Sequence, residues 1–261
     1  MKKLSIIGFF AKITIAVLIL IGVSSLLFAE IFKITKLPLT DDQQTIYSGT
    51  LGIMVTSLVF AIYAKKKGVA KEKADHKMKL NLRAILIALV SIAAIKVLFG
   101  TFVGMGLGHL FPTEAYTSNK STWLDHAYGI IIAPIAEEMM FRFGLYNIVS
   151  KRVGKTASLI FTSVIFTMLH GFRLDTLIEI FAASVVYTMI YELTGNVWYN
   201  IICHMMSNAF TSIVNELVHS GIPVFTEPKG YVIFNNMVMI AAAFIIITAI
   251  LVFKKKGFPR V

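Results

Sequence analysis

Long apolar runs separated by short polar connections make up most of the chain. Eight runs are expected to be helices, at residues 4–32, 46–64, 82–107, 126–150, 156–170, 176–193, 197–217 and 231–253. A helix needs about 20 apolar residues to cross the hydrocarbon core of a bilayer. Lipid satisfies no backbone hydrogen bonds, so spans are helices or closed barrels, and these runs are too long and too uniformly apolar for barrel strands. The pattern predicts an all-α, polytopic transmembrane helix bundle of about eight spans.

Basic residues in the connections predict the orientation. The connection from Lys65 to Arg83 carries eight Lys and Arg against two acidic residues, 151–155 carries three against none, and the tail after Phe253 carries four against none. Cytoplasmic connections are enriched in Lys and Arg. We therefore expect a multi-pass protein of the cell membrane with both termini in the cytoplasm. The run at 4–32 exceeds the roughly 7 to 15 residues of a signal-peptide core, which indicates an uncleaved first span.

Composition supports this interpretation. Of 261 residues, 57% are hydrophobic and 15% charged, which is too apolar for a soluble domain of this length. The net charge of +11 resides in clusters between apolar runs, so the lipid bilayer is the expected partner and nucleic acid is not. We expect one integral membrane domain in three parts: N-terminal helices at 1–124, a transmembrane core at 125–217 that carries the motifs described below, and a last helix with a basic tail at 218–261.

The most informative stretch places Glu137, Glu138 and Arg142 inside an apolar segment. An ionisable side chain at bilayer depth costs about 2.5 to 3.5 kcal/mol on insertion scales, so such residues face protein or trapped water and indicate a functional site. On a helix Glu138 and Arg142 are four residues apart and can pair, whereas Glu137 points about 100° away. Arg142 is therefore expected to hold Glu138, which leaves Glu137 for chemistry.

Two further runs carry polar side chains at helical spacing. Phe166 and His170 share a face near the end of the fifth run, and Asn200, His204 and Asn208 form a polar stripe along the seventh. Each has a structural interpretation, because a buried histidine can be a hydrogen-bonded packing residue and polar stripes join transmembrane helices. Three segments that each offer a suitable group favour a functional site.

These groups fit more than one chemistry. A desolvated glutamate suits a general base that takes a proton from water and returns it to a leaving amine. A histidine can hold that water, and a second histidine with an asparagine can stabilise an oxyanion. Alternatively, Glu137, His170 and His204 have the ligand types of a catalytic zinc with an open position. The spacing leaves both open, and buried Glu, Arg and His also occur in proton-coupled transporters.

The three segments resemble the motifs of a known family of intramembrane endopeptidases. This is the CAAX protease and bacteriocin-processing family, also called Abi, which includes the type II CAAX prenyl endopeptidase. The order of the motifs is the same, and the resemblance covers about residues 125–215. The matching patterns are Glu137-Glu138-x-x-x-Arg142, Phe166-x-x-x-His170 and His204-x-x-x-Asn208.

The resemblance implies hydrolysis of a peptide bond in a membrane-associated peptide or in the C-terminal segment of a membrane protein. It implies a general base at Glu137, a water-orienting residue at His170, supporting residues at Glu138 and Arg142, and an oxyanion-stabilising pair at His204 and Asn208. Family members are described both as metalloproteases and as glutamate-dependent proteases, so a metal such as zinc on Glu137, His170 and His204 is expected only if one is bound. Bacterial members serve bacteriocin immunity or peptide maturation, and a non-catalytic immunity protein is the alternative.

Two local expectations concern the helix ends. Trp123, Trp198 and Tyr199 lie near predicted span ends, where aromatic side chains anchor helices at the membrane interface. His204 is expected to lie about 10 Å nearer the cytoplasmic end than the other candidate groups, so that either the seventh helix begins after an irregular stretch from Gly195 to Asn200 or the other helices protrude. Gly195 and Asn196 favour the irregular stretch.

Overall fold

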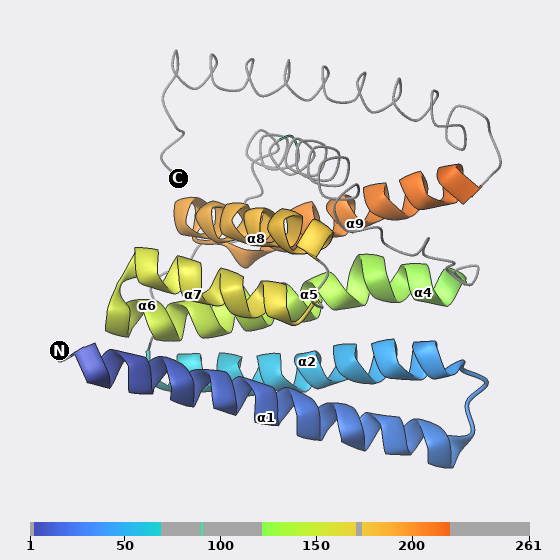
Figure 1. Cartoon of the computed structure of the whole chain (residues 1–261), viewed down its shortest axis with the longest axis horizontal. Helices are drawn as coiled ribbons and strands as arrows, with labels where there is room; N and C mark the ends of the chain where they lie inside the picture. Colours follow the sequence, from blue (N-terminus) through green and yellow to red (C-terminus); the bar gives the residue numbers. More distant parts are fainter. Residues whose placement is uncertain (1–2, 69–89, 91–121, 171–173, 220–261) are drawn as a thin grey trace. The chain divides into compact units, whose positions relative to one another are not determined.

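The computed structural model describes residues 3–68, 90, 122–170 and 174–219, and these ranges contain helices and no strands (Figure 1). The all-α prediction is confirmed for this part of the chain, whereas the runs expected at 82–107 and 231–253 lie outside the described residues. The helices are α1 Lys3–Thr35, α2 Asp41–Lys66, α4 Trp123–Ala127, η1 Tyr128–Ile132, α5 Ala133–Glu138, η2 Met139–Tyr146, α6 Asn147–Val153, α7 Lys155–Met168, α8 Leu174–Thr194 and α9 Val197–His219.

Two described helices are long and apolar enough to cross a membrane. They are Ser5–Thr35, with a mean hydropathy of 2.6, and Asp41–Lys66, with 1.7. Only 6% of the most apolar window of the first is buried inside the protein, which is unlike the core helix of a soluble domain. Helix α7 has 14 residues and is shorter than the roughly 20 that a span needs. Two spans are thus supported by length and composition, and the eight-span topology stays a prediction.

The chain forms two compact units. Unit 1 comprises residues 1–77 with 121–165, and unit 2 comprises 78–120 with 166–261. Unit 1 contains α1, α2, the helices from α4 to α6 and most of α7, and unit 2 contains α8 and α9. The division into three parts at 1–124, 125–217 and 218–261, which the sequence suggests, remains a prediction.

In unit 1, α1 and α2 form a tight helical hairpin (Figure 1). Thr40 begins α2 with a capping box, in which its hydroxyl accepts from the backbone N–H of Gln43 at 3.2 Å and the Gln43 side chain accepts from the Thr40 N–H at 3.1 Å. At Gly52 the helices approach so closely that a Cβ atom would overlap the Ser25 hydroxyl and lie 2.9 Å from the Ile21 carbonyl oxygen. Glycine is needed at this crossing because it has no side chain.

The helices from α4 to α6 form one continuous helical run from Trp123 to Val153, interrupted by two π-helical stretches. The first, η1, ends at Ile132, two residues before Pro134, which has no N–H to donate to the carbonyl four residues earlier. The N–H of Ala133 instead reaches the carbonyl of Tyr128, five residues back. The second, η2, contains Arg142, and π-helical turns are frequent at functional sites. The helix expected at 126–150 is confirmed, with longer bounds and altered geometry.

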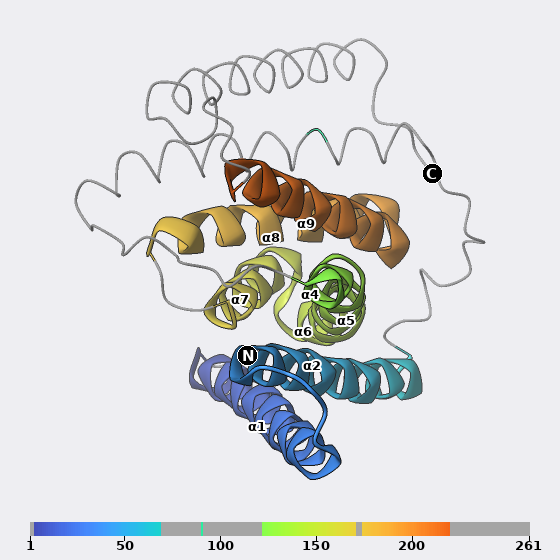
Figure 2. The ribbon, with the colours of Figure 1, turned by 90° about the vertical axis from the view of Figure 1, so that its right-hand side faces the viewer.

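Helix α2 crosses this run at an angle (Figure 2). The closest approach is at Gly144 in η2, where an added Cβ atom would lie 2.8 Å from the Cβ atom of Phe60. Real Cβ contacts are longer than this, so the small residue allows α2 to pack against the turn that follows Arg142.

A polar cluster links the start of α2 to the start of α4. Asp125 accepts hydrogen bonds from the Tyr47 hydroxyl at 2.6 Å, the Thr122 backbone N–H at 2.7 Å and the Gln43 amide at 3.2 Å. Burial alone would raise the pKa of Asp125, but these hydrogen bonds outweigh it and lower the pKa to about 2. The rings of Tyr47 and Tyr128 stack beside the cluster, with centroids 4.0 Å apart. The carboxylate therefore fixes the contact between the two helices.

In unit 2, α8 and α9 pack against each other and are joined by two residues (Figure 1). Gly195 has a φ of +67°, which suits glycine, and the Asn196 side chain caps α9 by accepting from the Trp198 N–H at 3.0 Å. Because α9 already begins at Val197, the irregular stretch expected to reach Asn200 is confined to Gly195 and Asn196. That expectation was wrong for the other residues because the capped turn needs no further length.

The aromatic residues near these ends behave differently from one another. Trp123 and Trp198 are 78% and 46% exposed, as residues at an interface would be. Tyr199 is only 3% exposed, so it packs inside the protein and its expected role as an interfacial anchor is wrong. Successive residues of a helix point about 100° apart, which explains why adjacent Trp198 and Tyr199 have opposite environments.

Candidate active site

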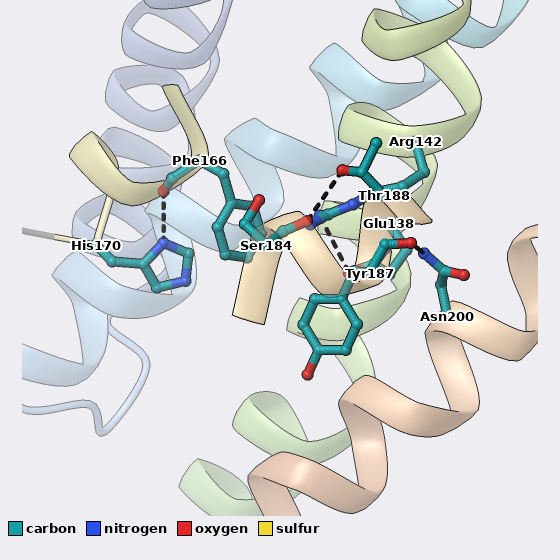
Figure 3. Close-up of polar contacts among 8 residues, drawn as sticks. All are labelled: Glu138, Arg142, Phe166, His170, Ser184, Tyr187, Thr188 and Asn200. Atoms are coloured by element: carbon teal, nitrogen blue, oxygen red, sulfur yellow. Dashed lines mark hydrogen bonds and ion pairs between the residues drawn. The ribbon is translucent and has the colours of Figure 1, made fainter. Parts of the chain in front are cut away.

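The two glutamates and the arginine of the candidate site lie where α5 passes into η2. A guanidinium nitrogen of Arg142 donates to the Glu138 carboxylate at 3.2 Å, as drawn in Figure 3. The Arg142 and Glu138 side chains are 1% and 0% exposed. Charges this far from water are tolerated only when each is compensated. The pairing expected from the four-residue spacing is confirmed.

Glu137 precedes Glu138 and is also buried, with 9% exposure. The two glutamates point in different directions from the same turn, because neighbouring residues of a helix are about 100° apart. The structure therefore separates a carboxylate that is ion-paired with Arg142 from a second buried carboxylate beside it. The role of Glu137 as the residue that does the chemistry stays a prediction.

The first histidine is oriented by its own helix end. The Nδ1 atom of His170 lies 2.7 Å from the carbonyl oxygen of Phe166 (Figure 3), and the two rings are 4.5 Å apart. A carbonyl oxygen only accepts, so Nδ1 carries the hydrogen, and in the neutral imidazole the lone pair is on Nε2. His170 can therefore accept a hydrogen bond from a water molecule through Nε2. The shared face of Phe166 and His170 is confirmed.

The second histidine, His204 on α9, is 6% exposed and lies among aromatic rings. The Tyr187 ring stacks on the imidazole at a centroid distance of 4.8 Å and an angle of 25°. The Phe166 ring is 6.1 Å away and tilted by 55°. Phe166 thus neighbours both His170 and His204, so both predicted histidines of unit 2 lie beside the same phenylalanine ring.

The polar stripe on α9 divides into residues with different functions. Asn200 is fully buried, and its side-chain amide donates to the backbone carbonyl of Tyr187 at 2.6 Å (Figure 3). It therefore fastens α9 to α8, which is the structural interpretation of such stripes. Asn208, one turn beyond His204, is half-buried. Its role beside His204 stays a prediction.

Sequence reasoning missed two buried residues of unit 2. Tyr187 lies on α8, which carries none of the motifs, and no spacing within α8 points to its contact with His204. Ser207 is 5% exposed and lies three residues after His204. Its hydroxyl has no hydrogen-bond partner among the residues that the structure describes, whereas the hydroxyls of Ser158, Thr162 and Thr188 each donate to a carbonyl four residues earlier in their helices. The sequence does not distinguish Ser207 from these three residues, and only the contacts in the structure do.

The predicted metal ligands were Glu137, His170 and His204. Within the described ranges, no group of three or more His, Cys, Asp or Glu side chains is arranged to hold a metal ion. The bond from Nδ1 of His170 to a carbonyl is nevertheless the contact that orients a metal-ligating histidine. The zinc site stays a prediction.

Comparison with known proteins addresses the family. Residues 119–210 match the family model described as Type II CAAX prenyl endopeptidase Rce1-like. This region of the chain is similar to that family. The matched region contains all three motifs, so the resemblance drawn from them is confirmed. The family is membrane-embedded and of the CAAX-protease type, in agreement with the two apolar helices of unit 1. No curated protein and no solved structure gives a significant match.

Proposed function

We propose that this chain is an intramembrane endopeptidase that cleaves a membrane-associated peptide or the C-terminal segment of a membrane protein with a glutamate-activated water. The observation that carries the proposal is the family match over residues 119–210, which contains all six candidate site residues. Its biological setting would be bacteriocin immunity or peptide maturation. We further propose a multi-pass location in the cell membrane with both termini in the cytoplasm.

In the proposed reaction Glu137 takes a proton from water, and the resulting hydroxide attacks the carbonyl carbon of the scissile peptide bond. The negative charge that develops on the carbonyl oxygen is stabilised by N–H donors of His204 and Asn208. Glu137 then returns the proton to the leaving amine as the C–N bond breaks. The proton is conserved, and the products are a carboxylic acid and an amine.

The tautomer of His170 supports its proposed role of orienting the attacking water. Because Nδ1 donates to the Phe166 carbonyl, Nε2 of the neutral ring is an acceptor and can hold one hydrogen of the attacking water. A water held in this way presents a lone pair to the substrate and its other hydrogen to a base. Orientation of this kind is a large part of catalysis, because it removes the entropy cost of aligning the reactants.

The ion pair of Glu138 and Arg142 has a supporting role in this proposal. It joins the last turn of α5 to η2 and thereby fixes the turn that carries Glu137. It also supplies Glu138 with its counter-charge inside the protein. Glu137 is then a second buried carboxylate beside this ion pair, in the position that we propose for the general base.

The test compares peptides released by membranes that contain wild-type protein, Glu137→Gln or His204→Ala at matched abundance. We expect both variants to lose specific peptides, because the amide of glutamine cannot take the proton and alanine offers no donor to the oxyanion. Glu30→Gln is the matched control, because Glu30 is 62% exposed in an ion pair with Lys33 on α1. Mass spectrometry of the released peptides gives the readout.

If both variants release the same peptides as the wild type, catalysis is the wrong explanation. Survival of a protective phenotype in those variants would then indicate a non-catalytic immunity or binding protein. If Glu30→Gln loses activity to the same degree as Glu137→Gln, the loss reflects damaged folding in the membrane and the assignment of Glu137 fails.

A further inference from the structure

Tyr187 is the residue through which α8 contacts the candidate site in unit 2. It is 2% exposed, and its ring lies nearly parallel to the His204 imidazole, at 4.8 Å and 25°. His204 is 6% exposed, so both rings are inside the protein. A stacked arrangement between two buried rings restricts each of them more than packing against flexible side chains does.

The backbone of Tyr187 is held by a second contact from α9. The Asn200 amide donates to the Tyr187 carbonyl oxygen at 2.6 Å, with Asn200 fully buried. Asn200 and His204 are four residues apart and share a face of α9. One turn of α9 thus contacts the carbonyl of Tyr187 and the next contacts its ring. Two contacts on one residue fix the direction of the ring relative to α9.

Orientation matters for the role proposed for His204. An imidazole on a helix can rotate about two side-chain bonds, and a donor that stabilises an oxyanion has to be held within about 10–20° of its productive direction. Leaving the present orientation would break the stack with Tyr187. A ring contact of this kind changes the population of the favoured orientation by a factor of about two to ten.

We propose that Tyr187 is a positioning residue for His204. Its ring face holds the imidazole in the orientation in which an N–H donor serves the oxyanion, and Asn200 keeps Tyr187 in place. This inference rests on the proposed function. The contact with His204 involves the ring face, so the phenol hydroxyl is dispensable for positioning.

The experiment measures kcat and KM of the full chain in proteoliposomes with a peptide identified by the release assay. Tyr187→Phe keeps the ring and should retain kcat within about twofold. Tyr187→Leu removes the ring and should lower kcat about three- to tenfold with KM changed less than about twofold, because the lost interaction acts in the transition state. A structural defect alone would lower the amount of active protein but leave kcat per folded molecule unchanged.

Tyr191→Leu is the matched control. Tyr191 lies one helical turn further along α8 and is also 2% exposed, so its truncation removes a comparable ring from the same helix. We expect Tyr191→Leu to lower thermal stability as much as Tyr187→Leu while keeping kcat per folded molecule within about twofold. If Tyr187→Leu fails to accumulate, Tyr187→Met takes its place, because methionine fills the volume without a ring.

Wild-type kcat in Tyr187→Leu or Tyr187→Met, or an equal loss of kcat in Tyr191→Leu, would overturn the inference while the proposed function stands. A fully active His204→Ala variant would instead overturn the role of His204, and with it the role of Tyr187. Loss of activity in Tyr187→Phe would show that the hydroxyl is required and that ring stacking is not the reason.

Discussion

The two regions that carry the candidate site hold their polar groups in opposite ways. In the helical run from Trp123 to Val153, Glu138 meets a charged partner on its own helix, one turn away and almost fully buried. In unit 2, His204 meets aromatic rings from other helices, and His170 meets a backbone carbonyl. The first arrangement is local and ionic, whereas the second is built largely from contacts of the imidazoles with aromatic rings and a backbone carbonyl.

The difference teaches where each region is vulnerable. Removing one partner of a buried ion pair leaves an uncompensated charge far from water, which is among the most destabilising changes known. Removing a ring beside an imidazole leaves a cavity and a less restricted side chain but no stranded charge. The carboxylate region should therefore govern folding strongly, and the histidine region should govern orientation.

The largest effect is expected from Arg142→Ala. This substitution strands Glu138, which is 0% exposed, and should lower the free energy of unfolding by about 3–5 kcal/mol. Denaturant unfolding in detergent micelles gives the measurement. The additional substitution Glu138→Ala should recover part of the loss, because it removes the stranded carboxylate.

The matched control is Arg152→Ala on α6, the last segment of the same helical run. Arg152 is exposed and lies over the Phe9 ring at 4.6 Å, so its loss should cost only about 0.5–1 kcal/mol. Equal losses in the two arginine variants, or simple addition of the losses in the Arg142 and Glu138 double variant, would contradict the buried ion pair as the source of the effect.

A smaller effect tests the Asp125 cluster at the start of that helical run. The pKa of Asp125 is lowered to about 2 in the folded protein, whereas an unfolded aspartate titrates near about 3.9. Its charged form therefore stabilises the fold above about pH 4, and this contribution is lost as the pH falls through about 2. Allowing for partial exposure, Asp125→Asn should cost about 1–2 kcal/mol at pH 7.

The wild-type and Asp125→Asn proteins should approach equal stability as the pH is lowered from about 4 to 2, because the wild-type carboxylate becomes protonated. Thermal unfolding at several pH values gives this difference. Asp42→Asn is the control, because Asp42 is exposed in the first turn of α2 and should change stability by less than about 1 kcal/mol. A difference that does not depend on pH would exclude the Asp125 carboxylate as its cause.

The smallest expected effect has the opposite sign. Within the described part of the chain the buried Ser207 hydroxyl has no hydrogen-bond partner, so Ser207→Ala should raise the free energy of unfolding by about 1 kcal/mol. Ser158→Ala should lower it by about 1 kcal/mol, because the buried Ser158 hydroxyl donates to the Gly154 carbonyl at 2.6 Å. The same denaturant measurement compares the two, and a loss of stability in Ser207→Ala would show that this hydroxyl has a partner.

Interactions within one helix could be predicted from spacing. The pair Glu138 and Arg142 and the pair Phe166 and His170 are each four residues apart, and both form the expected contacts. Proline has no N–H, so Pro134 indicates in the sequence that the helix is interrupted near this residue. The π-helical geometry of the interruption depends on how the backbone redistributes its hydrogen bonds. The opposite burial of Trp198 and Tyr199 had no signal in composition, because both are aromatic residues near a helix end.

The sequence by itself determined the helices, the pairings along them and the family that residues 119–210 resemble. These follow from hydrophobic periodicity and from side chains a fixed number of residues apart. Only the tertiary structure decided that Tyr187 stacks on His204, that Asn200 fastens α9 to α8, and that the Ser207 hydroxyl finds no partner in the described ranges. Such contacts join residues on different helices, and their geometry depends on how the helices pack, which no spacing within one helix specifies.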